Sequence, residues 1–260
     1  MHQPQIWSNP NSPPSEDLEI AAKSLFNLFP HWDVKLHGEL DSTNAEARRM
    51  SLTLGGDAYP RLIMTDFQNQ GAGRRGRSSM APPYISVLAS IMFPRAAFKK
   101  QKSLIPLYLG CWALEGIERL GPQNVEVKWP NDVLANGQKI AGLLCKFSAE
   151  AVVLGVGVNV TQRPDQLPER ERHDPAATSL AIECGEEAPS RMVSLITFVS
   201  AILENAENPA SEDWILHRYR KKCASFGKTI AFDDPQHGTL MGVAEDIDET
   251  GALVVSVEGY

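Results

Sequence analysis

Residues 125–160 read VEVKWPNDVLANGQKIAGLLCKFSAEAVVLGVGVNV, and this stretch decides the fold. Its apolar segments Val125 to Trp129, Lys139 to Phe147 and Ala151 to Val160 are short and rich in valine, isoleucine and leucine, as is typical of strands. Pro130-Asn131-Asp132 predicts a tight turn after the first segment, because proline and Asx residues favour turn conformations. We therefore expect consecutive strands of a mixed or antiparallel β-sheet.

Further strands and a glycine-rich loop lie N-terminal to this stretch. Leu62 to Phe67 and Ile85 to Phe93 are predicted strands, and residues 68–77 belong to the connection between them. Val34 to Leu40 is also a predicted strand. A helix should follow it, because Thr43-Asn44-Ala45-Glu46 has the Thr-x-x-Glu spacing of a capping box.

Amphipathic helices are predicted between and after the strands. Ser103 to Leu120 has apolar residues at intervals of three and four, with Pro106 in its first turn and Gly121-Pro122 as its stop. Ser190 to Asn205 and Glu212 to Cys223 show similar periodicity. These helices would cover the sheet and complete the main domain.

The two ends of the chain differ from its middle. Residues 1–30 should form a proline-rich tail and one helix, with helical spacing from Asp17 to Phe29. Residues 31–223 would form the main domain. Short β segments broken by turns predict a small β-barrel-like unit over residues 224–260.

The composition is that of a folded, acidic protein. The chain has 260 residues, of which 43% are hydrophobic, and a net charge of −7, so a general affinity for nucleic acid is disfavoured. Its longest apolar run, Leu104 to Leu114, is shorter than the ~20 residues that span a bilayer, so no transmembrane helix is expected. The N-terminus lacks secretory features and the four cysteines form no C-x-x-C pair, which predicts a cytoplasmic protein with reduced thiols.

Positive charge is concentrated locally within this acidic chain. The sequence GAGRRGR at residues 71–77 combines glycines, which allow close backbone approach, with guanidinium groups, which bind carboxylate or phosphate. Lys128 and Lys139 flank the turn at residues 130–132. Taken singly, the first segment could equally be a flexible basic loop, and a plain hairpin turn is favoured for the second.

Glycines occupy alternate positions of one predicted strand. Gly155 and Gly157 lie on the same face, which would leave a floor without side chains and room for a flat ligand. A bend in the strand is the simpler alternative.

Taken together, these segments fit a reaction that brings two anions together. A carboxylate and a nucleotide triphosphate about 4 Å apart would repel by ~4 kcal/mol per charge pair at an effective dielectric constant of about 20, and the cations would offset this repulsion. Asp132 would suit Mg²⁺ bound to the phosphates, because this ion prefers one or two carboxylates plus phosphate oxygens. The residues alone therefore indicate activation of a carboxylate by ATP.

In order and spacing, these segments resemble those of bacterial biotin protein ligases of the short type, which lack an N-terminal DNA-binding domain. The matching segments, from about residue 34 onward, are Ser42-Thr43-Asn44, Gln68 with Gly71 to Arg77, Lys128 to Asp132, Lys139 to Gly142, Gly155 to Asn159 and Ala177 to Leu180. The resemblance implies an α+β fold: a mixed β-sheet flanked by helices, as in lipoate ligases, followed by a small C-terminal SH3-like β-barrel.

The resemblance also implies an activity. The protein would use ATP and Mg²⁺ to convert biotin to biotinoyl-AMP, and transfer biotin to one lysine of a biotin carboxyl carrier protein of acetyl-CoA carboxylase or a related carboxylase. It would act as a monomer or homodimer, without nucleic acid or membrane as a partner.

The resemblance also implies which residues form the site. The implied catalytic residues are Lys139 and Arg74. The implied biotin-binding residues are Ser42, Thr43, Asn44, Gln68, Gly71, Ala72, Gly73, Arg74, Lys139, Gly142, Gly155 and Gly157. The implied nucleotide-binding residues are Arg74, Arg75, Arg77, Lys128, Asn131, Asp132 and Asn159, with Asp132 binding Mg²⁺ through the phosphates.

The chain departs from the family pattern at several positions. Ala72 stands where arginine is usual, Ser79 where an aromatic residue is usual, and Lys146 where glutamate is usual. Pro82-Pro83-Tyr84 replaces a pair of small residues. Together the departures leave open weaker retention of the adenylate, altered substrate choice or a degenerate enzyme. Ala72 and Ser79 predict the weaker retention, and Ala72, Ser79 and Lys146 leave open a non-catalytic biotin or adenylate sensor. A lipoate or octanoate ligase or transferase is the other alternative, although the Lys128 to Asp132 turn is not expected in that group.

Overall fold

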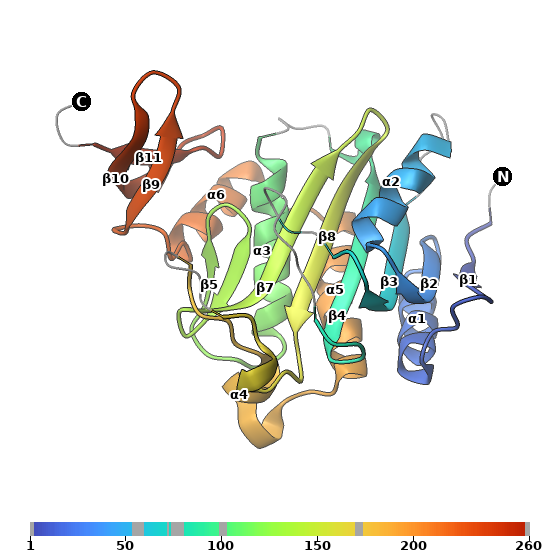
Figure 1. Ribbon diagram of the computed structural model, residues 1–260. Helices are drawn as coiled ribbons and strands as arrows, with labels where there is room; N and C mark the ends of the chain where they lie inside the picture. Colours follow the sequence, from blue (N-terminus) through green and yellow to red (C-terminus); the bar gives the residue numbers. More distant parts are fainter. Residues whose placement is uncertain are drawn as a thin grey trace.

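A central mixed β-sheet organises the molecule. The computed structural model describes residues 3–53, 60–71, 73, 81–98, 103–169 and 174–257. Within them, eight strands pair in the order β1-β2-β3-β4-β8-β7-β6-β5 (Figure 1). β1, β2 and β3 are parallel to one another, and the remaining neighbours are antiparallel. The strands are β1 (Ile6–Ser8), β2 (Asp33–Leu40), β3 (Arg61–Gln68), β4 (Ser86–Pro94), β5 (Val125–Lys128), β6 (Asp132–Ala135), β7 (Gln138–Phe147) and β8 (Ala151–Asn159).

The stretch at residues 125–160 contains one strand more than the three predicted. The additional strand, β6, is four residues long and forms a hairpin with β7. Asn136 and Gly137 connect the two strands with φ angles of 48° and 75°. An Asn-Gly pair with positive φ at both positions is a strong hairpin signal, so the sequence did contain the information that distinguishes β6 from a loop.

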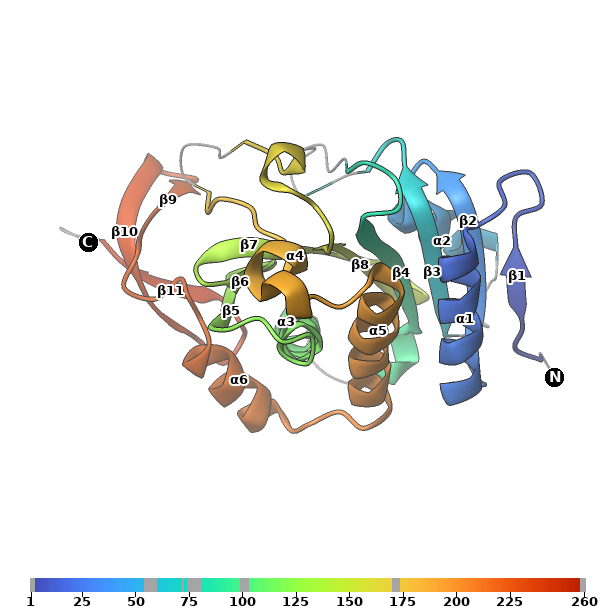
Figure 2. The ribbon, with the colours of Figure 1, turned by 90° about the horizontal axis from the view of Figure 1, so that it is seen from below.

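Helices cover the two faces of the sheet unequally. α1 (Glu16–Leu28), α3 (Ile105–Glu118) and α5 (Arg191–Glu207) pack side by side on one face, and α6 (Glu212–Lys221) packs against α3 (Figure 2). α2 (Thr43–Thr53) lies on the other face over β3, β4 and β8. A short helix, α4 (Leu180–Cys184), follows the loop after β8, and 3-10 turns lie at Arg95–Ala97, Pro164–Gln166 and Gly185–Glu187.

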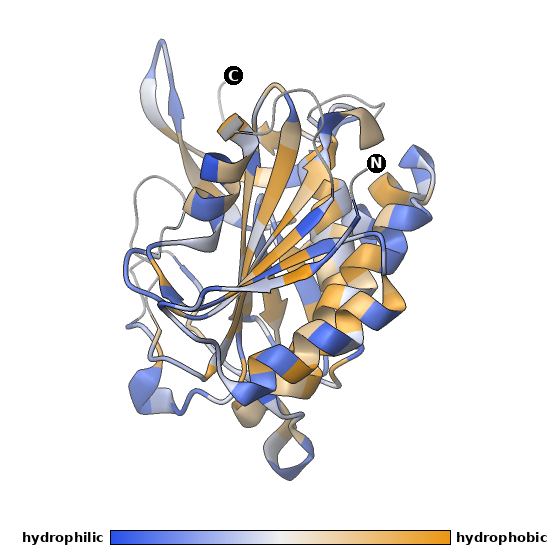
Figure 3. Ribbon diagram, turned by 90° about the vertical axis from the view of Figure 1, so that its right-hand side faces the viewer, coloured by the Kyte–Doolittle hydropathy of each residue, from blue (hydrophilic) through white to orange (hydrophobic). Residues whose placement is uncertain are grey.

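The hydrophobic core lies between the sheet and the layer formed by α1, α3 and α5. α3 is buried on almost all sides, and Trp112 at its centre is 2% exposed. In Figure 3 the central strands are predominantly hydrophobic, whereas the outer helices combine hydrophobic and hydrophilic residues. None of the helices in the described part of the chain is both long and apolar enough to span a membrane. All four cysteines are free, and burial raises the pKa of the Cys111 and Cys145 thiols to about 12.

A second, smaller sheet follows α6. β9 (Thr229–Asp234), β10 (Gly238–Ile247) and β11 (Leu253–Ser256) form an antiparallel sheet in the order β11-β10-β9. Trp129 connects it to the main sheet, because its indole nitrogen donates to the Gly251 carbonyl at 3.3 Å and its amide donates to Ser225 Oγ at 3.0 Å. The predicted α+β fold class is confirmed. The domain boundaries at residues 30/31 and 223/224 stay a prediction, and α1 packs against α5 and β2 as part of the core.

A buried ion pair lies where the neighbouring helices α1 and α5 begin. Arg191, the first residue of α5, donates to Asp66 Oδ1 on β3 at 2.7 Å, and both side chains are less than 5% exposed. Arg191 also donates to the Ser86 and Thr65 carbonyls, while Ser15 at the start of α1 donates its amide and hydroxyl to Asp66 at 2.7 Å. Every charge in the cluster is therefore hydrogen-bonded, as burial requires.

Removing one partner of this pair should strongly destabilise the fold. We expect Arg191→Met to lower the free energy of unfolding by about 3–5 kcal/mol, because it leaves the Asp66 carboxylate buried without a counter-charge. Arg163→Met is the matched control, because Arg163 pairs with Asp165 where both side chains are 68% exposed, and we expect a change below about 0.5 kcal/mol. Urea denaturation measures both values; similar values for the two variants would contradict the role assigned to Arg191.

Candidate active site

A strip of low side-chain density crosses the face of the sheet that carries α2. Strand register places Leu88 on β4, Gly157 on β8, Gly142 on β7 and Asp132 on β6 in one row. Among the residues that the structure describes, no heavy atom would lie within 4 Å of a Cβ atom built on Gly157. This glycine therefore leaves an open floor between α2 and the β6–β7 hairpin.

Gly155, the other glycine predicted to form this floor, has a different environment. A Cβ atom at Gly155 would lie 1.9 Å from Nδ2 of Asn44, the second residue of α2. The absence of a side chain at Gly155 is thus what allows the start of α2 to pack directly on β8. The two glycines were predicted to form one surface, but their roles differ. Gly155 allows α2 to pack on β8, whereas Gly157 leaves open space above the sheet.

Polar residues converge at the N-terminus of α2. Thr43 donates its amide at 2.8 Å and its hydroxyl at 3.1 Å to Oε1 of Gln68 at the end of β3. Ser90 Oγ lies 2.8 Å from Thr43 Oγ1 and 3.3 Å from Asn44 Oδ1. Ser42, Thr43 and Asn44 are all buried. The structure thus brings together the four polar residues predicted to contact biotin, from two elements 25 residues apart.

The residue before this cluster fixes the path of the chain into α2. Asp41 accepts two hydrogen bonds from the Arg49 guanidinium, at 2.7 and 2.8 Å, and one from the Ser42 amide at 2.7 Å. The side-chain hydrogen bonds from Arg49 lower the pKa of Asp41 to about 2. Asp41 is therefore a carboxylate at any pH near neutrality, and it anchors the helix start.

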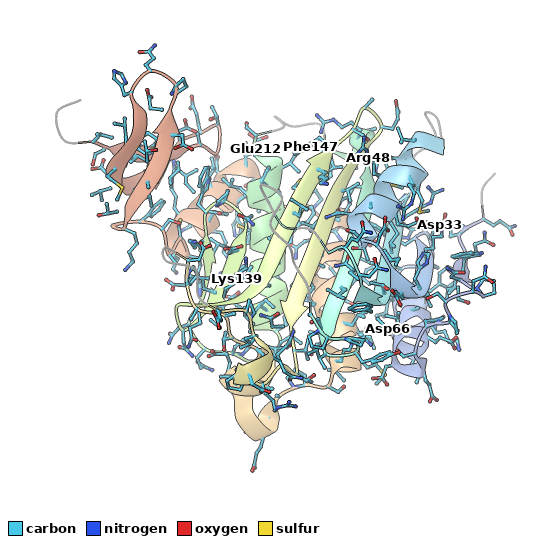
Figure 4. The ribbon with its side chains drawn as sticks, in the orientation of Figure 1. Asp33, Arg48, Asp66, Lys139, Phe147 and Glu212 are labelled. Carbon is cyan, nitrogen blue, oxygen red and sulfur yellow. The ribbon has the colours of Figure 1, made fainter. Side chains whose placement is uncertain are left out.

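Lys139 and Asp132 lie on the opposite side of the glycine floor (Figure 4, Lys139 labelled). The Lys139 ammonium lies 2.8 Å from Asp132 Oδ1, and its Nζ would be 3.5 Å from a Cβ atom at Gly142. Asn131 Nδ2 donates to Asp132 Oδ1 and to the Leu143 carbonyl, both at 3.2 Å. The hairpin of β6 and β7 therefore places a cation directly over the strip of glycines.

Two further predicted nucleotide-binding residues are described: Lys128 ends β5, the strand paired with β6, and Asn159 ends β8. Lys128 Nζ lies 3.1 Å from Asp174 Oδ1, with both side chains about a third exposed. Asn159 is engaged at both ends of its amide: Nδ2 donates to the Thr178 carbonyl at 2.8 Å, and Oδ1 accepts from Gln162 at 3.2 Å. One donor hydrogen and one acceptor lone pair of Asn159 are not used by these bonds.

Part of the predicted cationic loop lies outside the described residues. Gly71, which is buried, and Gly73 are described. The residues not described are Ala72, Arg74, Arg75, Arg77 and Ser79. Of the other departures from the family pattern, Lys146 is exposed on β7, and Tyr84 is exposed with a φ of 69°.

The donor set for a metal ion is small. In the parts of the chain that the structure describes, no group of three or more His, Cys, Asp or Glu side chains could hold a metal. Asp132 supplies one carboxylate beside the open floor. A single carboxylate fits Mg²⁺ that takes its other ligands from phosphate and water, and it does not fit a metal held by the protein alone.

Comparison with known proteins identifies the family. Residues 40–161 match the profile of the Biotin/lipoate A/B protein ligase family. Over 84% of its length the chain is 32% identical to the Biotin--[acetyl-CoA-carboxylase] ligase of Mycobacterium tuberculosis, covering 81% of that protein. The chain belongs to the biotin protein ligases. It is also 29% identical to the Paracoccus denitrificans enzyme of the same name, covering 90% of it.

Solved structures show the same fold. The biotin protein ligase of Aquifex aeolicus, in complex with biotin and ATP, superimposes with a TM-score of 0.69 at 24% identity, over 86% of this chain and 92% of that one. The Leishmania major biotin protein ligase, in complex with biotinyl-5-AMP, gives a TM-score of 0.63 at 19% identity, over 88% and 96% of the two chains. The family resemblance stated from the sequence is confirmed.

Two residues that join the site were not predicted from the sequence: Ser90 contacts Thr43 and Asn44, and Gln162 contacts Asn159. Ala177 belongs to a segment that matches the family, and the structure gives it a place, a backbone bridge with Lys139. The signal for Ser90 was present, because a hydroxyl in the apolar segment VLASIMF needs a partner once it is buried. Gln162 follows β8 in a loop and carries no comparable signal.

The two glycines of β8 give a direct test of this geometry. We expect Gly155→Ala to move Asn44 out of place, breaking its contact with Ser90 and lowering stability by about 1–2 kcal/mol. Gly157→Ala should change the stability of the ligand-free protein by less than about 0.5 kcal/mol, because its methyl group enters open space. Thermal denaturation measures the stability of both variants. An equal loss of stability in the two would mean that the position of Asn44 does not depend on Gly155.

Proposed function

We propose that this protein activates biotin with ATP to give biotinoyl-AMP and PPi, and then transfers the biotinyl group to one lysine of a biotin carboxyl carrier protein. The observation that carries the proposal is the Lys139 ammonium held over Gly142, at the edge of an open floor whose other edge is the polar start of α2. The sequence identity to the Mycobacterium tuberculosis ligase supports the same reaction.

The polar residues at the start of α2 would bind the biotin ring. Thr43, Asn44 and Gln68 offer both donors and acceptors, which a ureido group requires, and Ser42 adds a hydroxyl. Gly142 and Gly157 would let the flat part of the ligand lie against the sheet. Gly71, Ala72 and Gly73 belong to the proposed biotin site, whereas Gly155 would contribute by seating Asn44.

Two cationic groups would serve the first step. A biotin carboxylate oxygen attacks the α-phosphorus of ATP, the bond to the bridging oxygen breaks, and PPi leaves with its electron pair. Lys139 and Arg74 would stabilise the negative charge that builds up on the phosphoryl oxygens, a role that matters most in the transition state. Lys128, Asn131, Asn159, Arg75 and Arg77 would bind the nucleotide.

Mg²⁺ would neutralise phosphate charge when bound, and Asp132 is the residue that would hold it. In the second step, the neutral amine of the carrier lysine attacks the acyl carbon of biotinoyl-AMP. The acyl–oxygen bond breaks, AMP leaves, and the amine loses a proton.

We also propose the organisation in which this reaction occurs. Residues 31–223 would be the catalytic domain, residues 224–260 a short SH3-like C-terminal domain, and residues 1–30 an N-terminal tail with one helix. The protein would act in the cytoplasm as a monomer or homodimer. Its substrate would be the carrier protein of acetyl-CoA carboxylase or a related carboxylase.

Mass spectrometry of a purified carrier domain tests the proposed function. After incubation with the protein, biotin and Mg·ATP, the carrier should gain the mass of one biotinyl group, and it should gain none without ATP. Parallel reactions with lipoate and octanoate test the alternatives within the fold. Transfer of lipoate in the absence of biotin transfer would overturn the assignment, and release of neither adenylate nor biotinylated carrier would favour a sensor.

Lys139→Met should separate binding from chemistry. We expect adenylate formation to fall by about 10²–10³, because the variant loses the charge that offsets the phosphoryl transition state, while the affinity for biotin alone changes little. Lys23→Met on α1 is the control, because the Lys23 side chain is 67% exposed and lies on the other face of the sheet, and it should keep the wild-type rate. Pyrophosphate release measures the rate, and biotin titration measures the affinity. A wild-type rate in Lys139→Met would show that Lys139 has no role in adenylate formation.

A further inference from the structure

Gln162 lies at the centre of a buried polar chain just beyond the end of β8. Its side chain is almost completely enclosed, with the residue 1% exposed. Nε2 donates to Ser86 Oγ at 2.7 Å and to Asn159 Oδ1 at 3.2 Å, and the Gln162 carbonyl accepts from Ser179 Oγ at 2.7 Å. Both hydrogen bonds of the amide are made by Nε2, and the buried Oε1 has no partner among the described residues, so the two donor contacts alone fix the orientation of the Gln162 amide.

The chain continues from Gln162 to the proposed catalytic lysine. Because Oδ1 of Asn159 faces Gln162, its Nδ2 is directed to the Thr178 carbonyl, which it reaches at 2.8 Å. The Thr178 amide in turn donates to the Lys139 carbonyl at 2.9 Å, and the Lys139 amide donates to the Ala176 carbonyl at 2.7 Å. Residues 176–178 thus lie alongside the start of β7 as a single parallel bridge.

The isolated bridge between Lys139 and Ala177 has only two backbone hydrogen bonds, so other contacts must hold residues 176–178 in place. The Thr178 hydroxyl donates to Glu183 at 2.6 Å, which tethers the side chain, but the Thr178 carbonyl depends on Asn159. The other end of the chain is rigid, because the carbonyl of Ser86 accepts from Arg191 in the buried ion pair. The Gln162 side chain links this rigid base to Asn159 and so to the Thr178 carbonyl. The segment after Thr178 is also held by backbone contacts, from Ser179 Oγ to the Gln162 carbonyl and from the Ala181 amide to the Val160 carbonyl.

We propose that Gln162 is a positioning residue for biotin activation. By fixing the orientation of the Asn159 amide, it holds residues 176–178 against the start of β7 and thereby keeps Lys139 in place over Gly142. The inference rests on the proposed function for its effect on rate, and on the hydrogen bonds alone for its effect on structure.

Gln162→Leu tests the proposal, because leucine has a similar volume and no donor. We expect the rate of adenylate formation to fall about tenfold, the equivalent of one or two lost hydrogen bonds, while the dissociation constant for biotin stays within twofold. Gln166→Leu is the matched control: Gln166 lies four residues away and caps only the turn at Pro164–Gln166, so the rate should stay within twofold of wild type.

Hydrogen exchange distinguishes positioning from general stability. In Gln162→Leu the amides of Lys139 and Thr178 should exchange about tenfold faster than in the wild type, whereas the amides of β4 should be unchanged. If Gln162→Leu does not fold, Gln162→Asn carries the same test, since its amide is one methylene too short to reach Ser86 and Asn159 together.

Two results would overturn the proposal. One is a wild-type rate of adenylate formation with only a lower melting temperature, which is what a purely structural residue would give. The other is a slower reaction without faster exchange at Lys139 and Thr178. If the wild-type protein does not activate biotin at all, the proposed function fails, and the exchange comparison still decides whether Gln162 holds residues 176–178.

Discussion

The Asp66 carboxylate is the point from which both halves of the site are positioned. Three donors, the Ser15 amide, the Ser15 hydroxyl and the Arg191 guanidinium, bind it at 2.7 Å in an environment where its side chain is 1% exposed. Such a cluster is costly to desolvate and strongly destabilising to break, so its geometry is fixed. Figure 4 labels Asp66 near the lower end of the sheet, and its partners Ser15 and Arg191 stand at the starts of α1 and α5.

Each half of the site extends from this cluster along a different strand. Along β3, Gln68 follows Asp66 by two residues. Its Oε1 accepts hydrogen bonds from both the amide and the hydroxyl of Thr43, and these bonds fix the start of α2. Along β4, the Ser86 carbonyl accepts from Arg191, and the Ser86 hydroxyl begins the chain to Gln162. One ion pair therefore supports the surface proposed for biotin and, at greater distance, the lysine proposed for phosphoryl transfer.

Local sequence patterns predicted the elements well, because they depend on periodicity and turn chemistry. α2 begins at Thr43, where a helix start was predicted, and the apolar spacing of α3 appears at the predicted place. The two residues of the predicted capping box make other contacts: the Thr43 hydroxyl donates to Gln68, and Glu46 accepts from Lys35 and Arg49. The contacts that build the site are of another kind. Ser90 and Asn44 are 46 residues apart, Gln162 and Ser86 are 76, and Arg191 and Asp66 are 125. Such pairings follow from strand order, which periodicity does not specify.

The resting site is electrostatically balanced, and this balance has a consequence for substrate binding. Lys139 and Asp132 form a close pair, with the lysine 39% and the aspartate 11% exposed, so their fields largely cancel at a distance. Lys128 is likewise paired with Asp174.

Two anionic substrates would therefore meet little net attraction from these paired residues until they approach within hydrogen-bonding range. Arg74, Arg75 and Arg77 precede β4 in the chain, and long-range attraction of ATP and biotin must come from such additional cations or from Mg²⁺ bound to the phosphates. In the proposed reaction, the paired lysine would contribute at the reacting phosphorus, where the direction of its hydrogen bond matters more than long-range attraction.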